Sequence, residues 1–308
     1  MTEAASGRRS ASAVLPFPAP LSAPLSAPPA AGLPERRFTE VEGIPIAWVE
    51  AGAGPDLILV HGALMCLEDM WLGPMAALAR HFRVVAIDRP GHGASGHARL
   101  ADGSLWRQAG ILRGLAGRIG LERPVVAGHS FGGAVALAYG LAYPDATRGI
   151  VAMAPIAFPE PRLEQVLFGP RAVPVGGDLL SALLGPADAL LLPLLWRAMF
   201  LPQGMPERFA AAFPFGLASR PDRLVAEGEN ANLLWPDLAR SVAAYPTCRV
   251  PVHILGGDRD IVTNQSLHGR GAALMIPGAR LHWLPGQGHM LHHFRPDAVV
   301  EAALAVAG

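Results

Sequence analysis

The chain has 308 residues, of which 51% are hydrophobic and 16% are charged, so it can bury a sizeable core in one large domain or in a domain with an insertion. Its 25 lysines and arginines balance its 25 aspartates and glutamates, which gives a formal net charge of zero. This balance disfavours a nucleic-acid partner and offers little attraction to an anionic membrane surface, because both require an excess of basic residues.

Residues 1–36 form a tail rich in proline and alanine. Proline at this density prevents the helical apolar core of a secretion signal, so we predict a disordered or polyproline-like tail. Arg8 and Arg9 form a twin arginine, but no uninterrupted apolar stretch follows them. Export or tethering through the tail is therefore the minority interpretation.

The cysteines and the apolar runs favour a cytoplasmic protein. Cys66 and Cys248 are far apart in the sequence, so we expect two reduced thiols, with Cys66 in a packing role. No charge-free apolar run is long enough for a transmembrane helix. The nearest approach, residues 179–202, is interrupted by Asp188, Arg197 and prolines, and it predicts one or two short apolar helices. The oligomeric state is left open.

Short apolar runs alternate with helical patterns along the first half of the chain. We predict strands over residues 44–50, 56–60, 83–87, 124–127 and 149–153, and helices over 75–80, 105–119 and 131–143. Continuous apolar runs are typical of strands buried on both faces. Their alternation with helices predicts an α/β fold with a mostly parallel, doubly wound sheet.

This alternation stops between residues 156 and 245, where Pro, Leu, Phe and Trp are frequent and no strand pattern is visible. It resumes with strands predicted over 252–255 and 280–284 and helices over 264–275 and 296–306. We therefore predict a core made of residues 37–155 and 246–308, with residues 156–245 inserted as a helical cap.

A candidate nucleophile lies in the sequence Gly-His-Ser-Phe-Gly at residues 128–132. The G-x-S-x-G pattern alone is weak, but here it follows a predicted strand and opens a predicted helix. That context forces Ser130 into a strained turn, exposes its hydroxyl above the sheet and places it at a helix N-terminus. The alternative, a serine that only caps the helix, is less favoured.

The loop after the strand at 56–60 is a candidate oxyanion loop. It reads His61-Gly62-Ala63 and ends at the sheet edge where such folds bind ligands. We expect the backbone N–H groups of Ala63 and Phe131 to bind a forming oxyanion, and His61 to be structural. The expected pocket residues are Leu64, Met65 and Trp71, which are equally compatible with plain core packing, and Trp196, Met199 and Phe200 from the inserted segment.

The base and the acid are expected in the last third of the chain. A serine needs an adjacent base that titrates near neutral pH, and His289 lies in a glycine-rich loop after a predicted strand. Asp258 and Asp260 compete for the role of the acid after the strand at 252–255. Asp260 is favoured, mostly by similarity to related motifs, and Asp258 is then a turn residue that caps its own backbone.

His292 and His293 follow the candidate base and invite a metal interpretation. We reject it, because no carboxylate or cysteine with zinc-site spacing accompanies them. We expect them to form the first turn of a surface or cap-facing segment. No metal or organic cofactor is expected.

Together these motifs resemble the α/β-hydrolase superfamily over about residues 37–308. The similarity rests on the HGA loop, DRPGHGAS at residues 88–95, GHSFGG, GGDRDIV and GQGH, with nucleophile, acid and base in the order of that family. Within the superfamily the chain resembles esterases, haloperoxidase-like enzymes and carbon–carbon bond hydrolases, and more weakly the hydrolase-like accessory protein of magnesium chelatase. A haloalkane dehalogenase is disfavoured, because Ser130 stands where that group has aspartate.

The sequence therefore predicts a serine hydrolase that cleaves a small apolar carboxylic ester through Ser130, Asp260 and His289. One alternative is another reaction on the same residues, such as perhydrolysis, acyl transfer or carbon–carbon bond cleavage. The other is a binding or accessory protein that keeps the fold without turnover. The exact substrate does not follow from the sequence.

Overall fold

The computed structural model describes residue 32 and residues 34–174 and 176–308, so most of the predicted tail lies outside the described residues. One eight-stranded sheet has the order β1-β2-β4-β3-β5-β6-β7-β8. β2 pairs antiparallel with both β1 and β4, and all other neighbours are parallel. The strands are β1 (Arg37–Val41), β2 (Ile44–Ala51), β3 (Asp56–Val60), β4 (Arg83–Ile87), β5 (Val125–His129), β6 (Gly149–Met153), β7 (Val252–Gly257) and β8 (Arg280–Leu284).

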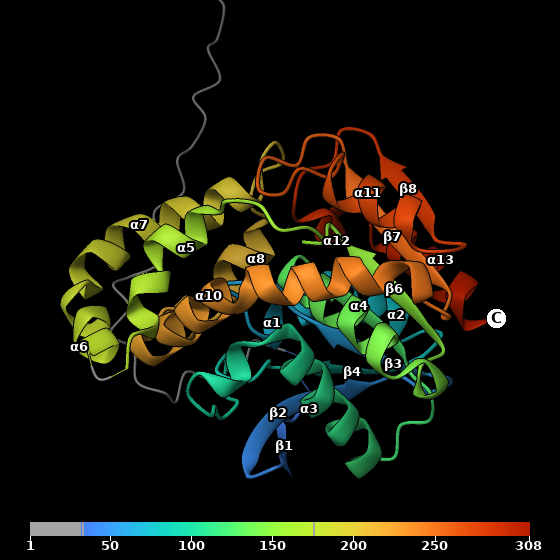
Figure 1. Ribbon diagram of the computed structural model, residues 1–308, viewed down its shortest axis with the longest axis horizontal. Coiled ribbons are helices and arrows are strands. Elements are labelled where there is room, and N and C mark those ends of the chain that lie inside the picture. Colours follow the sequence, from blue (N-terminus) through green and yellow to red (C-terminus); the bar gives the residue numbers. More distant parts are fainter. Residues whose placement is uncertain (1–31, 33, 175) are drawn as a thin grey trace, which may run out of the picture.

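Helices cover both faces of this sheet, as Figure 1 shows. In β3, Ile58 and Val60 pack toward α3 (Leu105–Arg118) and α4 (Phe131–Ala142), while Leu57 and Leu59 pack toward α2 (Ala76–Leu78) and α13 (Pro296–Ala307). Both faces are apolar because neither faces water, which explains the continuous apolar run of this strand. The predicted mostly parallel, doubly wound sheet is confirmed. Further short helices around the core are α1 (Leu67–Met70), α11 (His268–Met275) and α12 (Leu291–Phe294).

The strand β1 is an element that the sequence analysis missed. It pairs with β2, and the side chain of Phe38 is 58% exposed. Buried and exposed side chains therefore alternate too weakly along β1 for the sequence to show the pattern of a strand. The predicted tail ends at about residue 36. Arg36 forms an ion pair with Glu68 and lies 3.8 Å from Asp88, so it packs against the core.

The segment between β6 and β7 forms the helical cap (Figure 1). Its aromatic and aliphatic side chains, among them Phe168, Trp196 and Phe209, pack with core residues such as Met65 and Met290 into one apolar cluster. Its helices are α5 (Leu163–Leu167), α6 (Gly176–Leu183), α7 (Gly185–Met199), α8 (Glu207–Ala212), α9 (Phe215–Ala218) and α10 (Pro221–Ala244). Shorter helical turns in the chain are η1 (Trp71–Met75), η2 (Ala101–Gly103), η3 (Pro144–Ala146), η4 (Gly169–Ala172) and η5 (Tyr245–Thr247).

The long helix α10 joins the cap to the core. It packs against α6 and η4 in the cap and against α3 and α4 over the sheet, a path that Figure 1 shows from left to right.

Among the described residues, no single helix is long and apolar enough to cross a membrane; α6 and α7 have the required length and composition only as a pair, which is bent by 73°. Cys66 and Cys248 are both free and buried.

The sharp turn between β5 and α4 generates a stability prediction. A Cβ on Gly128 would lie 2.0 Å from the carbonyl oxygen of Gly132, so we expect Gly128→Ala to lower the free energy of unfolding by about 3 kcal/mol. Gly117→Ala, on the exposed side of α3, is the matched control and should change it by less than about 1 kcal/mol. Urea unfolding measures both, and equal effects would contradict the tight approach described here.

Candidate functional site

Ser130 lies at the reversal of the chain between β5 and α4. Its backbone has φ 53° and ψ −115°, a conformation that a residue with a Cβ rarely adopts. A Cβ on Gly132 would lie 2.3 Å from the carbonyl oxygen of Val60, and Gly128 is equally crowded. Only glycine therefore fits on these two sides of the serine. The turn places Ser130 at the start of α4, where the helix dipole favours negative charge.

The predicted oxyanion loop lies against this turn. A Cβ on Gly62 would be 3.3 Å from the Cβ of Ser130. Arg89, from the turn after β4, donates hydrogen bonds to the carbonyl oxygens of His61 (3.1 Å) and Gly62 (3.0 Å). His61 is fully buried, and burial together with the Arg89 charge lowers its pKa well below the usual value. Neutral His61 thus accepts the backbone N–H of Arg89 and supports the loop.

Two backbone N–H groups beside the serine remain available. Within the described part of the chain, neither the N–H of Ala63 nor that of Phe131 has a hydrogen-bond acceptor. Ala63 lines the pocket that contains Ser130, and Phe131 is the first residue of α4. The N–H of Leu64, the next along the loop, is bound by the carboxylate of Glu227. Ala63 and Phe131 are therefore the groups that can bind a substrate oxygen here.

The predicted acid and base meet at the same edge of the sheet. Oδ2 of Asp260 lies 2.9 Å from Nδ1 of His289, and both side chains are fully buried. The backbone N–H groups of Val262 and Thr263 donate to Oδ1 of Asp260, and the Thr263 hydroxyl donates to Oδ2. Burial alone would raise the pKa of Asp260, but His289 and these hydrogen bonds hold it well below the usual value. The acid therefore stays ionised.

An ionised carboxylate at Nδ1 fixes the tautomer of the imidazole, with the proton on Nδ1 and the lone pair on Nε2. Nε2 of His289 is buried and has no hydrogen-bond partner among the described residues. The expected hydrogen bond between Ser130 and His289 is therefore not formed, although both residues line one pocket. Such bonds are often long or misaligned until substrate is bound.

The loop that carries His289 is held from two sides. Asp258, expected to cap its own backbone, instead accepts the backbone N–H of Gly286 at 2.6 Å. Gln203, from the cap, donates to the carbonyl oxygen of Gly286 (2.6 Å) and accepts the N–H of Gly288 (3.1 Å). Nothing in the local sequence marks Gln203 for this role, because its contact spans the boundary between cap and core.

The pocket shared by Ser130 and His289 has a volume of about 310 Å³. Its floor is the oxyanion loop, and its walls are cap helices and the loop after β7. Apolar side chains from the cap form most of the wall, namely Leu163, Leu167, Phe168, Leu195, Ala198 and Met199. A charged group, Glu160, Arg162 and Glu164, forms one side, with Arg162 paired to both glutamates.

The pocket residues predicted from sequence divide into two groups. Leu64 and Met199 line the pocket. Met65, Trp196 and Phe200 are not among its lining residues, because they are buried in the apolar cluster beneath the cap, where the indole N–H of Trp196 donates to the carbonyl oxygen of Leu64. Trp71 is likewise outside the lining and packs between that cluster and the core.

His292 and His293 have a carboxylate partner that zinc-site spacing does not reveal. Nε2 of each imidazole lies within hydrogen-bond distance of Oδ1 of Asp69, at 3.1 Å and 2.8 Å, and all three side chains are buried. Asp69 is distant in sequence, so spacing rules do not find it. These atoms are close enough to share a metal ion. However, Nδ1 of His292 has no partner in the described structure, whereas a metal-bound imidazole normally donates its other N–H.

Cys66, Glu68 and Asp88 form another group of potential metal ligands. Arg36 lies within ion-pair distance of both carboxylates, and the backbone N–H groups of Leu67 and Ala94 donate to Asp88. These contacts pair both carboxylates with donors, although Oε2 of Glu68 has no hydrogen-bond partner among the described residues.

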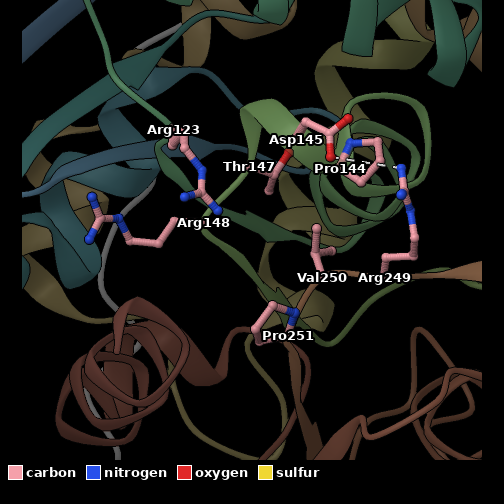
Figure 2. Close-up of a pocket in the computed structure, with 8 residues that line it drawn as sticks. All are labelled: Arg123, Pro144, Asp145, Thr147, Arg148, Arg249, Val250 and Pro251. Atoms are coloured by element: carbon pink, nitrogen blue, oxygen red, sulfur yellow. Dashed lines mark ion pairs between the residues drawn. The ribbon is translucent and has the colours of Figure 1, made fainter.

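A second hollow lies away from this site, at the amino ends of β5, β6 and β7. Figure 2 shows the residues that line it, among them Arg123, Arg148 and Arg249. Arg249 forms an ion pair with Asp145 at 3.8 Å, which is the dashed line in the figure. Because parallel strands run in one direction, this hollow is at the opposite sheet edge from Ser130 and His289.

Comparison with known proteins identifies relatives of this arrangement. Residues 57–302 match the model of the alpha/beta hydrolase family. An uncharacterised protein of Mycobacterium tuberculosis is 28% identical over 288 residues, covering 87% of this chain and 80% of that one. A crystal structure of an alpha/beta hydrolase fold protein from Burkholderia ambifaria superposes with a TM-score of 0.73 at 24% identity, over 87% of this chain and 97% of that one. A pimeloyl-[acyl-carrier protein] methyl ester esterase of Nitrosomonas europaea is 36% identical over 104 residues, covering 33% of this chain and 38% of that one.

The buried histidine cluster predicts how stability depends on pH. Burial lowers the pKa of His292 from its usual 6.5 to about 4, despite the opposing effect of Asp69. Between these values the unfolded chain takes up a proton that the folded chain does not, so the free energy of unfolding should fall as the pH is lowered through this range. His292→Gln should reduce this slope by up to about 1.4 kcal/mol per pH unit. Urea unfolding at several pH values tests this, and an unchanged slope would refute it.

Proposed function

The chain belongs to the alpha/beta hydrolase family, and we propose that it hydrolyses a carboxylic ester of an apolar substrate through an acyl-Ser130 intermediate. The observation that carries this proposal is the 2.9 Å contact between Asp260 and His289, in a pocket that also contains Ser130 on its strained turn. The match over part of the chain to a methyl ester esterase also supports it.

The first half of the reaction forms the acyl-enzyme. Nε2 of His289 takes the hydroxyl proton of Ser130 as Oγ attacks the ester carbonyl carbon. The carbonyl oxygen becomes an oxyanion and accepts hydrogen bonds from the N–H groups of Ala63 and Phe131. Each such donor stabilises the transition state by about 3–4 kcal/mol, as judged from the loss of rate when one is removed by mutation. When the tetrahedral intermediate collapses, the ester C–O bond breaks and the imidazolium gives its proton to the leaving alcohol.

The second half releases the acid. His289 takes a proton from water, the hydroxide attacks the acyl carbon, and the new intermediate expels Ser130, which recovers its proton. Asp260 stays ionised throughout, orients the imidazole and stabilises the imidazolium. Loss of that orientation lowers the rate about 10⁴-fold in comparable sites.

The pocket favours an apolar acyl or alcohol group. Its cap wall is made of leucine, phenylalanine, methionine and alanine side chains, so each CH₂ that a substrate buries there contributes about 0.8 kcal/mol. Other chemistry on the same residues would give other products. Analysis of products formed with a competing alcohol or with peroxide separates hydrolysis from acyl transfer and perhydrolysis.

Ser130→Ala tests the nucleophile. We expect kcat for a p-nitrophenyl ester to fall by at least about 10³-fold, because the variant cannot form the acyl-enzyme. The melting temperature serves as the control for folding; alanine keeps the Cβ and therefore the strain at this position, so the melting temperature should stay close to that of the wild type. Turnover that persists at the wild-type rate would reject Ser130.

Ala198→Phe tests the acyl pocket. Ala198 lines the cap wall, so a phenyl ring there should shorten the preferred acyl chain and raise KM for long-chain esters about tenfold, while acetate esters change little. Ala211→Phe, at an exposed position of α8, is the matched control. A profile over ester chain length measures both, and identical profiles for the two variants would exclude this wall from acyl binding.

A further inference from the structure

Glu227 is a buried carboxylate of helix α10 that contacts the oxyanion loop from outside the pocket. It is 4% exposed, and its Oε1 accepts the backbone N–H of Leu64. The same oxygen lies 3.0 Å from Nε2 of His92 and 3.9 Å from Nη2 of Arg89. A carboxylate this deeply buried is costly unless it is paired, so its position calls for a specific role.

The direction of the Ala63 N–H follows from the contacts of the preceding carbonyl oxygen, that of Gly62. The peptide unit between Gly62 and Ala63 is planar, so its carbonyl oxygen and its N–H point in opposite directions. That oxygen is held by Nη2 of Arg89 at 3.0 Å and by Nδ1 of His61 at 2.8 Å. With the carbonyl fixed in this way, the Ala63 N–H at the other side of the plane is left facing the pocket that Ala63 lines.

The next peptide unit along the loop is fixed as well. Its N–H belongs to Leu64 and is bound by Glu227. Leu64 has φ +56°, which costs free energy for a residue other than glycine and persists only where surrounding contacts impose it. Glu227 therefore acts on both units: it binds the second directly and offsets the charge of Arg89, which holds the first.

We propose that Glu227 is a positioning residue, whose carboxylate holds the loop 61–64 so that the Ala63 N–H faces the substrate oxygen. The inference rests on the proposed serine hydrolase function and adds a residue that does not touch the substrate. Because α10 also packs against the cap elements α6 and η4, the same contact links the cap to the oxyanion loop.

Glu229 offers a matched control two residues along the same helix. It is 1% exposed and is bound by His97 (2.7 Å), by Arg99 and by the backbone N–H of Leu100 (2.8 Å). It thus resembles Glu227 in burial and in its set of partners. Its partners belong to the loop 97–100, which does not line the catalytic pocket.

The experiment compares Glu227→Ala and Glu229→Ala by steady-state kinetics with a p-nitrophenyl ester, by the rate at which a fluorophosphonate labels Ser130, and by melting temperature. Glu227→Ala should lower kcat and the labelling rate about 100-fold with KM changed less than about threefold, as when an oxyanion donor is lost. Glu229→Ala should lower the melting temperature comparably but keep kcat within about threefold. Equal losses of kcat in the two variants, or a Glu227→Ala loss confined to KM, would overturn the proposal.

Two further variants separate geometry from charge and keep the test decisive if Glu227→Ala does not fold. Glu227→Gln keeps an oxygen for the Leu64 N–H and should restore kcat to within about tenfold of wild type, whereas Glu227→Asp keeps the charge but withdraws the carboxylate and should not. A higher kcat for Glu227→Asp than for Glu227→Gln would overturn the proposal. A wild-type protein that neither turns over esters nor is labelled at Ser130 would instead refute the proposed function on which it rests.

Discussion

The close approach of backbone to backbone where β5 turns into α4 is the constraint on which the site depends. Gly128 and Gly132 leave no room for a Cβ, and the chain between them must place Ser130 at φ 53°. Such strain costs of the order of 1–3 kcal/mol and persists only when its surroundings impose it. Here the imposing structure is the sheet itself, buried on both faces, with Ser130 N–H bound to the carbonyl oxygen of Met153 on the neighbouring strand.

The core and the cap make different contributions. The core brings Ser130, Asp260 and His289 to one edge, because the loops after parallel strands all leave the sheet on the same side. The cap forms most of the pocket wall, and it also reaches the loops of the core. Gln203 holds the loop of His289 and Glu227 holds the oxyanion loop, so the position of the cap affects the candidate reaction centre as well as access to it.

The parts of the molecule that follow from the sequence are those governed by local rules. Strands that are buried on both faces, such as β3, are continuous apolar runs in the sequence and can be recognised from it. The glycines around Ser130 can also be recognised, because the close approach of the backbone at the turn requires them. The partners Asp69 for His292 and Glu227 for Leu64 are contacts between distant segments, which no spacing rule describes. The pocket wall was also only partly predicted, because which apolar side chains of the cap line the cavity, as Phe168 does, and which pack its interior, as Trp196 and Phe200 do, depends on the tertiary packing of the cap.

The central claim is that Ser130 becomes covalently acylated. The most direct measurement is mass spectrometry of the protein quenched in acid during turnover of a p-nitrophenyl ester, followed by digestion and sequencing of the peptide that carries residue 130. We predict the mass of the acyl group on Ser130 and its absence from the Ser130→Ala protein treated in the same way. Ester turnover with no acyl group on that peptide, or with the group on another residue, would contradict the account.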